Sequence, residues 1–125
     1  MHALTTFLLT LLVPGIAGSA SGGAPADAQV PLAEVRNAEA FLRARPDTPL
    51  TPYVYLWIQH RQRAAFELET ETEARVRAAR KYQTFLKRAR GSSLAMVVSL
   101  AEAIDAQPFV CRDVAAHPRD VLPAG

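Results

Sequence analysis

Apolar residues recur every three or four positions along most of the chain after residue 31, which is the spacing of helices that bury one face. We expect four such helices: Pro31 or Leu32 to about Arg45, Thr51 to the Glu-rich stretch 67–73, about Thr72 to Arg90, and Ser92 to before Pro108. The predicted fold is therefore all-α, with four helices in two antiparallel αα-hairpins.

The start of the second helix is set by Thr51 and Pro52, which fit an N-cap followed by proline in the first turn. Residues 53–58 are six apolar side chains that favour β-structure and also fit a buried strand. Because Gln59 and the residues after it continue without a breaker, the sequence favours a helix here.

The boundary between the second and third helices is predicted from the length of the segment they share. One unbroken helix over 53–90 would be about 57 Å long, too long for a compact domain of this size. Glutamates at 67, 69, 71 and 73 form like-charged i,i+4 pairs that repel within a helix. We therefore place the break there, with Thr70 and Glu73 as a capping box or Thr72 as the N-cap.

The N-terminal stretch carries no charged side chain before Asp27. Residues 3–13 are an apolar run, ended by Pro14-Gly15 and followed by small residues, which is the order of a secretory signal peptide. The run covers about 16 Å as a helix, half of a bilayer core, so an uncleaved anchor is the weaker alternative. We expect an exported, periplasmic or secreted protein with three parts: signal peptide and linker 1–28, helical-hairpin domain 29–107, and an extended or disordered tail 108–125.

The net charge and the cysteine content restrict the classes of protein to which this chain can belong. The formal net charge of +2 is too small to indicate nucleic-acid binding. Cys111 is the only cysteine, so no intrachain disulfide forms and apolar packing must stabilise the domain. Its thiol is either inert or a partner in an intermolecular disulfide.

Sequence motifs for catalysis or metal binding are missing: there is no Ser/His/Asp order, Gly-rich phosphate loop or Cys/His cluster. His60 and Glu67 are about 10 Å apart along a helix, too far for one metal ion without other ligands. We expect no catalytic, cofactor-binding or metal-binding residue, no cofactor and no enzymatic activity. If the protein is an enzyme, His60, Arg61 and Glu67 are its only plausible polar cluster.

Two surfaces are candidates for partner binding. Tyr53, Trp57 and His60 form a stripe on the second helix that is either core, the favoured interpretation, or an exposed binding patch. The third helix is rich in basic residues, which form a solvated face or contact an acidic partner or lipid head groups. The residues selected as possible interaction sites are Tyr53, Trp57, His60, Arg61, Arg77, Lys81 and Arg88.

An internal repeat relates the two predicted hairpins. Phe41-Leu42-Arg43 recurs as Phe85-Leu86-Lys87 after a shift of 44 residues, and no gap is needed across the following turn. We therefore expect Phe41 and Phe85 to be buried at equivalent places in the two hairpins.

The repeat resembles the tetratricopeptide-like helical hairpins of bacterial envelope proteins in two stretches, Ala38-Glu-Ala-Phe41-Leu42 with Pro46-Asp-Thr-Pro49, and Ala78-x-x-x-Tyr82-x-x-Phe85-Leu86. The period departs from the usual 34 residues, and the Trp-x-x-Leu-Gly start is missing. The stretch 48–66 is also similar to uncharacterised small secreted bacterial proteins, which implies no function.

These features together predict a non-enzymatic helical module whose groove between the hairpins binds a protein or peptide partner and no nucleic acid. The alternatives are a small enzyme or accessory subunit, and a peripheral membrane adaptor that uses the basic third helix. Membrane contact is expected only if the N-terminal segment stays uncleaved or that helix binds lipid.

Overall fold

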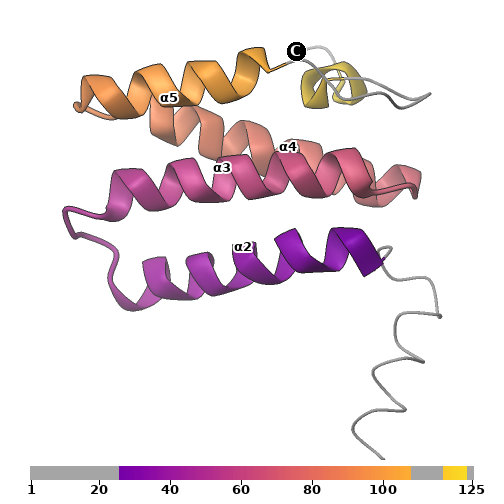
Figure 1. Ribbon diagram of the computed structural model, residues 1–125, viewed down its shortest axis with the longest axis horizontal. Coiled ribbons are helices and arrows are strands. Elements are labelled where there is room, and N and C mark those ends of the chain that lie inside the picture. Colours follow the sequence, from indigo (N-terminus) through magenta and orange to yellow (C-terminus); the bar gives the residue numbers. More distant parts are fainter. Residues whose placement is uncertain (1–25, 108–116, 124–125) are drawn as a thin grey trace, which may run out of the picture.

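The computed structural model describes residues 26–107 and 117–123, and these residues form helices and no strands. The elements are α2 (Ala26–Ala44), α3 (Thr51–Leu68), α4 (Thr72–Arg90), α5 (Ala95–Ala106) and the 3₁₀ turn η1 (Pro118–Val121). The predicted all-α class with four helices is confirmed (Figure 1). The apolar run 3–13, Cys111 and most of the expected tail lie outside the described residues.

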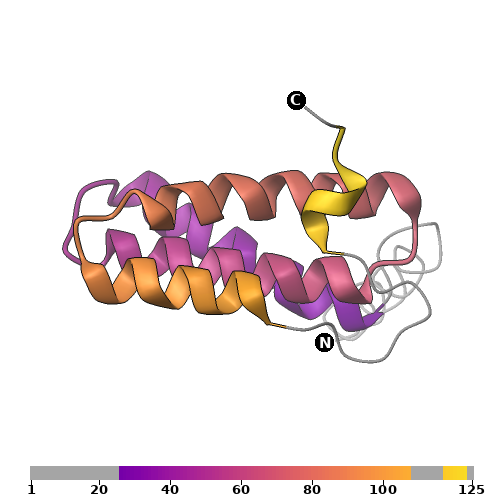
Figure 2. The ribbon, with the colours of Figure 1, turned by 90° about the horizontal axis from the view of Figure 1, so that it is seen from above.

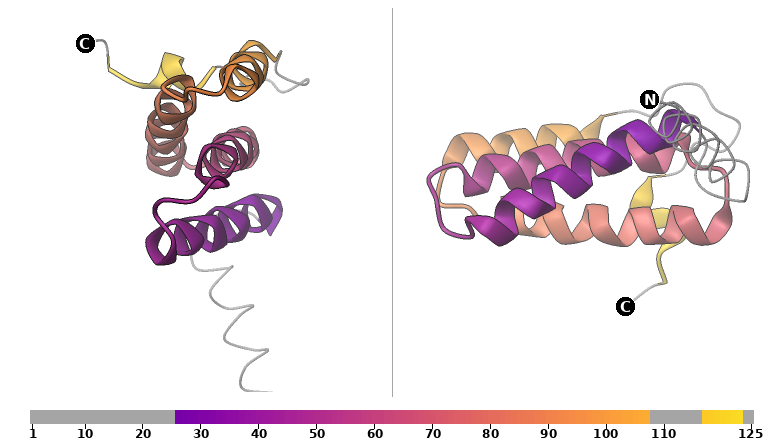
Figure 3. Two further views of the ribbon diagram at one scale, coloured as in Figure 1. Left: turned by 90° about the vertical axis from the view of Figure 1, so that its left-hand side faces the viewer. Right: turned by 90° about the horizontal axis from the view of Figure 1, so that it is seen from below.

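Helix α3 is the central helix. It packs against α2 on one side and against α4 and α5 on the other, and η1 packs against α4. Seen end-on, α2 lies on one side of α3, and α4 and α5 lie on the opposite side (Figure 3, left). Figure 2 shows α4 and α5 running beside each other, with η1 lying across α4.

The core follows the apolar stripes of the helices. The largest cluster joins α3, α4 and α5 through Leu56, Tyr82, Leu86 and Val97. A second cluster places Ile58 of α3 between α2 and α4, and a third packs Phe66 of α3 on alanines of α4. One face of α4 is buried in these clusters by six residues: Ala78, Ala79, Tyr82, Phe85, Leu86 and Ala89.

Buried or half-buried arginines close the C-terminal ends of two helices. Arg75 donates from Nη1 to the carbonyls of Phe66 and Glu69 at 3.3 Å, and its guanidinium lies 4.2 Å from the Phe66 ring centroid. Arg63, only 3% exposed, donates to the carbonyls of Ile104 and Gln107 at the end of α5. In both places a cation meets carbonyls at the C-terminal end of a helix, the negative end of the helix dipole.

Helix α2 begins five residues before the earliest start that the sequence predicted. Pro31 lies inside it, and residues 26–28, which were expected to belong to the linker, are helical. A proline near the start of a helix removes only one backbone hydrogen bond. Ala28 and Pro31 are both buried, so packing offsets that loss, and Asp27 in the first turn complements the helix dipole.

The predicted caps are wrong in detail. Leu50, not Thr51, is the N-cap of α3. The Thr51 hydroxyl instead joins the turn before the helix, accepting a hydrogen bond from the Thr48 N–H at 3.1 Å. The break after α3 is confirmed, but Glu71 caps α4, because its carboxylate accepts the N–H groups of Glu73 and Ala74.

The start of α5 and the C-terminal tail also differ from prediction. Helix α5 starts at Ala95 rather than Ser92, whose hydroxyl accepts the Leu94 N–H. Residues 117–123 were expected to be extended or disordered. They form a turn in which His117 and Asp120 make a capping box, and His117 is buried.

Candidate interaction site

An apolar cleft of about 490 Å³ lies between α2 and α3. Trp57 is 45% exposed there, so the prediction that it is buried in the core is wrong. Helix α2 packs over the Ile58 side of α3 and leaves the neighbouring Trp57 edge uncovered. The residues that line the cleft are Glu34, Asn37, Ala38 and Phe41 of α2, Leu50, and Tyr53, Val54 and Trp57 of α3.

The Trp57 indole is held in place by polar neighbours. The His60 ring stacks against it with centroids 6.1 Å apart, and the Arg61 guanidinium lies 5.5 Å from its centroid. Arg61 is fixed in turn by Glu34 of α2, with Nη2 and Oε1 3.0 Å apart. The large aromatic side chain is therefore exposed and also oriented, because its two polar neighbours restrict its movement.

His60 was expected to fill a buried or half-buried packing position, but it is exposed. Partial desolvation lowers the pKa of its imidazole, and the positive charges of Arg61 and Arg63 lower it further. Its ring is consequently neutral at pH 7, and it contacts Trp57 as an uncharged aromatic group.

The three residues considered for an enzyme site bind to different partners. Arg61 pairs with Glu34, Glu67 accepts from Nε of Arg63 at 3.3 Å, and His60 stacks on Trp57. Within residues 26–107 and 117–123, no group of three or more His, Cys, Asp or Glu side chains is placed to hold a metal ion.

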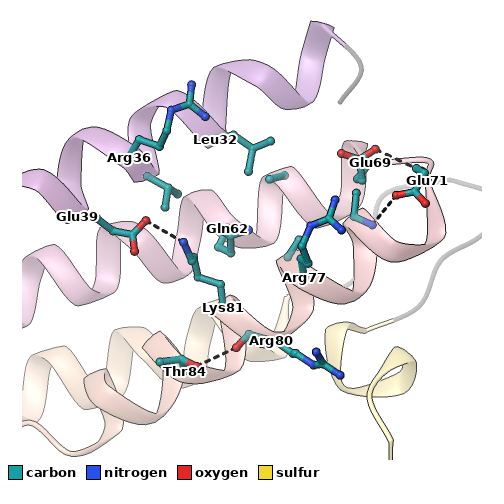
Figure 4. Close-up of a pocket in the computed structure, with 14 residues that line it drawn as sticks. Leu32, Arg36, Glu39, Gln62, Glu69, Glu71, Arg77, Arg80, Lys81 and Thr84 are labelled. Carbon is teal, nitrogen blue, oxygen red and sulfur yellow. Dashed lines mark hydrogen bonds and ion pairs between the residues drawn. The ribbon is translucent and has the colours of Figure 1, made fainter. Parts of the chain in front are cut away.

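The basic residues selected on the third helix do not share one surface. Arg77 and Lys81 face a groove of about 660 Å³ between α2 and α4, whose floor is α3 (Figure 4). Arg88 lies apart, with its guanidinium 4.7 Å from the Phe85 ring centroid and 5.7 Å from that of Tyr55. The groove is lined by Leu32, Val35, Arg36, Glu39, Gln62, Ala65, Glu69, Glu71, Ala74, Arg77, Ala78, Arg80, Lys81 and Thr84.

A buried polar cluster at the junction of α4, α5 and η1 was missed by the sequence analysis. Asp105 Oδ1 accepts hydrogen bonds of 2.7 Å from the Tyr82 hydroxyl and from Nε2 of His117. Gln59 of α3 reaches the same cluster and donates to the Ala101 carbonyl at 3.0 Å. The one sequence signal was His117-Pro118-Arg119-Asp120, which has the composition of a capped turn.

The cluster shifts the pKa values of two of its members. Burial by itself raises the pKa of the Asp105 carboxyl, but the hydrogen bonds from Tyr82 and His117 outweigh this, so the pKa is lowered overall. Burial and the hydrogen bond to Asp105 raise the pKa of the Tyr82 phenol. Both groups therefore keep one protonation state across neutral pH, as expected for a structural cluster.

Compared with protein-family models, curated proteins and solved structures, the chain matches none. Across the described helices, none is both long and apolar enough to cross a membrane. The class that the described residues define is a helical domain with a central helix and a surface hollow on each side of α2.

Proposed function

We propose that this chain is an exported, non-enzymatic binding module that holds a segment of another protein in the apolar cleft beside Trp57. This cleft lies within the first hairpin, between α2 and α3, and not in the groove between the hairpins where the sequence placed the binding site. The observation that carries the proposal is the exposed, oriented indole in a lined cleft. Tryptophan is the residue type most enriched among side chains that dominate binding energy at interfaces, and apolar clefts with few polar groups are common binding sites.

The chemistry of the cleft indicates what its occupant presents. Among the described residues that line it, Glu34 is the one charged side chain, and Arg61 already neutralises it. Tyr53 and Leu50 are exposed at the cleft beside Trp57. The occupant is therefore a segment with an apolar anchor side chain, whose burial against the indole supplies most of the affinity.

Export is proposed from residues 3–13 and the small-residue tract after them. The small-residue tract offers cleavage after Ala20 or after Ala28. Helix α2 begins at Ala26 and Ala28 is buried, so cleavage after Ala20 leaves the folded domain whole. Cleavage after Ala28 would remove a packed residue. N-terminal sequencing of the exported protein tests this point, and protein that keeps Met1 and stays in the membrane contradicts the proposal.

The binding proposal is tested by a photo-crosslinking amino acid placed at Tyr53 in producing cells, with the same group at Met96 as control. Met96 is 66% exposed and lies on α5, away from the cleft. A protein that crosslinks from position 53 alone is then purified and titrated against the unmodified chain.

We expect Trp57→Ala to weaken that binding by about thirtyfold, the effect of removing an interface hot spot. The matched variant Met96→Ala keeps full affinity. Equal affinity for both variants, or crosslinks only between two copies of the chain, would overturn the proposal.

A further inference from the structure

We infer that the groove between α2 and α4 is a second binding site, and that it takes an acidic polypeptide segment. It lies on the other side of α2 from the Trp57 cleft and shares no lining residue with it. Two features of the groove carry the inference. On its floor is a buried acceptor that no described residue donates to, and on its walls are arginines that form no ion pair with a described residue.

The acceptor is the side-chain carbonyl of Gln62 on α3. Gln62 is 2% exposed and lines the groove, and its Oε1 atom is buried with no hydrogen-bond partner among the described residues. An unpaired buried amide oxygen destabilises a fold, and such atoms are rare in proteins. Figure 4 shows Gln62 among the residues that line the floor of the groove.

The walls carry the positive charge. Arg36 of α2 and Arg77 of α4 are exposed and form no ion pair with a described residue. Lys81 binds the Glu39 carboxylate across the groove at 2.9 Å. That pair shows that a carboxylate fits between the walls.

The acidic residues of the groove do not neutralise these arginines. Glu69 is buried and accepts the N–H groups of Thr70 and Glu71, while Glu71 caps α4. With Glu39 bound to Lys81, each acidic side chain of the lining already has hydrogen-bond donors. The unpaired charge that remains in the groove is positive and favours an anionic ligand.

A polypeptide fits these two features better than other anions. An inorganic anion or a lipid phosphate offers acceptors but no donor for Gln62, whereas a peptide with glutamate or aspartate offers carboxylates and backbone N–H groups. A flat bilayer also cannot reach a side chain that is almost fully buried on the floor of a groove. The ligand is therefore an acidic stretch of chain lying between α2 and α4.

The inference is tested on the purified full chain by fluorescence anisotropy. The probe is a labelled, acetylated peptide in which glutamate alternates with alanine, and the control probe carries glutamine in place of glutamate. We expect binding of the glutamate peptide alone, weakening with added salt as exposed charge pairs do. Arg77→Gln should weaken it by about tenfold, the effect of losing one hydrogen bond between charged groups.

Two variants separate a site from general attraction. Arg45→Gln removes the same charge from an exposed position outside the groove, and it should leave the affinity unchanged. Gln62→Met keeps the size of the floor residue but removes the amide, so it should weaken binding without lowering the melting temperature.

Four outcomes would overturn the inference: no binding of the glutamate peptide, equal binding of both peptides, equal loss in Arg45→Gln and Arg77→Gln, or full binding by Gln62→Met. The same variants are also tested for binding to vesicles that contain anionic lipids. Binding to them that is lost in Arg77→Gln, without binding of the glutamate peptide, would assign the groove to a membrane surface instead. A negative result with these peptides does not bear on the proposed binding at the Trp57 cleft, because neither peptide carries an apolar anchor side chain for that cleft.

Discussion

His117 and Asp105 are joined by a hydrogen bond of 2.7 Å between Nε2 and Oδ1, which ties the C-terminal turn to the end of α5. Nδ1 of the same ring accepts the Arg119 N–H at 3.0 Å, so a neutral His117 carries its proton on Nε2 and donates it to Asp105. The ring edge also packs against Tyr82 in a T-shaped contact. The Asp105 carboxylate thereby joins the short turn to both α4 and α5, and Val121 and Leu122 add apolar contacts with Ala78 and Ala79.

Replacing that carboxylate should destabilise the fold. We expect Asp105→Asn to lower the free energy of unfolding by about 1–3 kcal/mol, because it weakens the hydrogen bonds of buried Tyr82 and His117. Thermal unfolding of the purified protein measures the change. Glu102→Gln, one turn earlier on α5, is the matched control, since Glu102 is exposed and its carboxylate pairs with the exposed Arg90. A larger loss in the control would contradict the role assigned to Asp105.

The same carboxylate predicts a loss of stability in acid. Its pKa in the folded protein is below the ordinary value near 3.8, so the unfolded chain binds the proton more readily. The stabilisation is complete above that value and is lost as the pH falls below it. Urea unfolding between neutral pH and strong acid should show this loss in the native protein and a shallower one in Asp105→Asn. Parallel curves would contradict the prediction.

Replacing Arg63 should lower the free energy of unfolding more than replacing most other charged residues. Its guanidinium is buried, binds two carbonyls at the end of α5 and also contacts Glu67. We expect Arg63→Ala to cost about 3 kcal/mol, and Arg63→Lys to recover only part of it, because one ammonium cannot reproduce the planar fork. Arg61→Ala breaks a half-exposed pair with Glu34 and should cost below about 1 kcal/mol. Chemical denaturation compares the three variants.

The exposure of Trp57 predicts its fluorescence. Its emission should lie toward the solvent-exposed maximum and be quenched readily by acrylamide, since nearly half of the side chain contacts solvent. Protonation of the stacked His60 should quench it further, with a midpoint below pH 6.5 because the pKa of His60 is lowered. His60→Gln should abolish that step. A blue-shifted emission that resists acrylamide would contradict the exposed placement.

Replacing Phe85 should destabilise the fold more than replacing Phe41, although the internal repeat predicts equal effects. Phe85 is buried in the core, whereas Phe41 is only half-buried and lines the Trp57 cleft. We expect Phe85→Ala to cost about 3–5 kcal/mol, the range for emptying a core aromatic. Phe41→Ala should cost clearly less, because part of its ring is already in water. Equal melting temperatures for the two variants would support equivalent burial instead.

Much of the fold follows from local patterns in the sequence. Apolar residues at helical spacing predicted the four helices, and the repelling glutamates predicted the break between α3 and α4. These signals act over one or two turns, so they are readable without knowing which helices meet. The buried face of α4 follows in the same way, because one stripe of that helix is apolar and the rest is charged.

Tertiary packing decided which apolar residues stay exposed and which polar residues become buried. Helix α3 is apolar around most of its start, so its sequence could not show that α2 covers Ile58 and leaves Trp57 open. Burial of Gln62, and the meeting of His117 with Asp105, likewise depend on neighbours brought together by the fold. A periodic pattern predicts which face of a helix is apolar, but exposure depends on the distance and angle of the helix that packs on it.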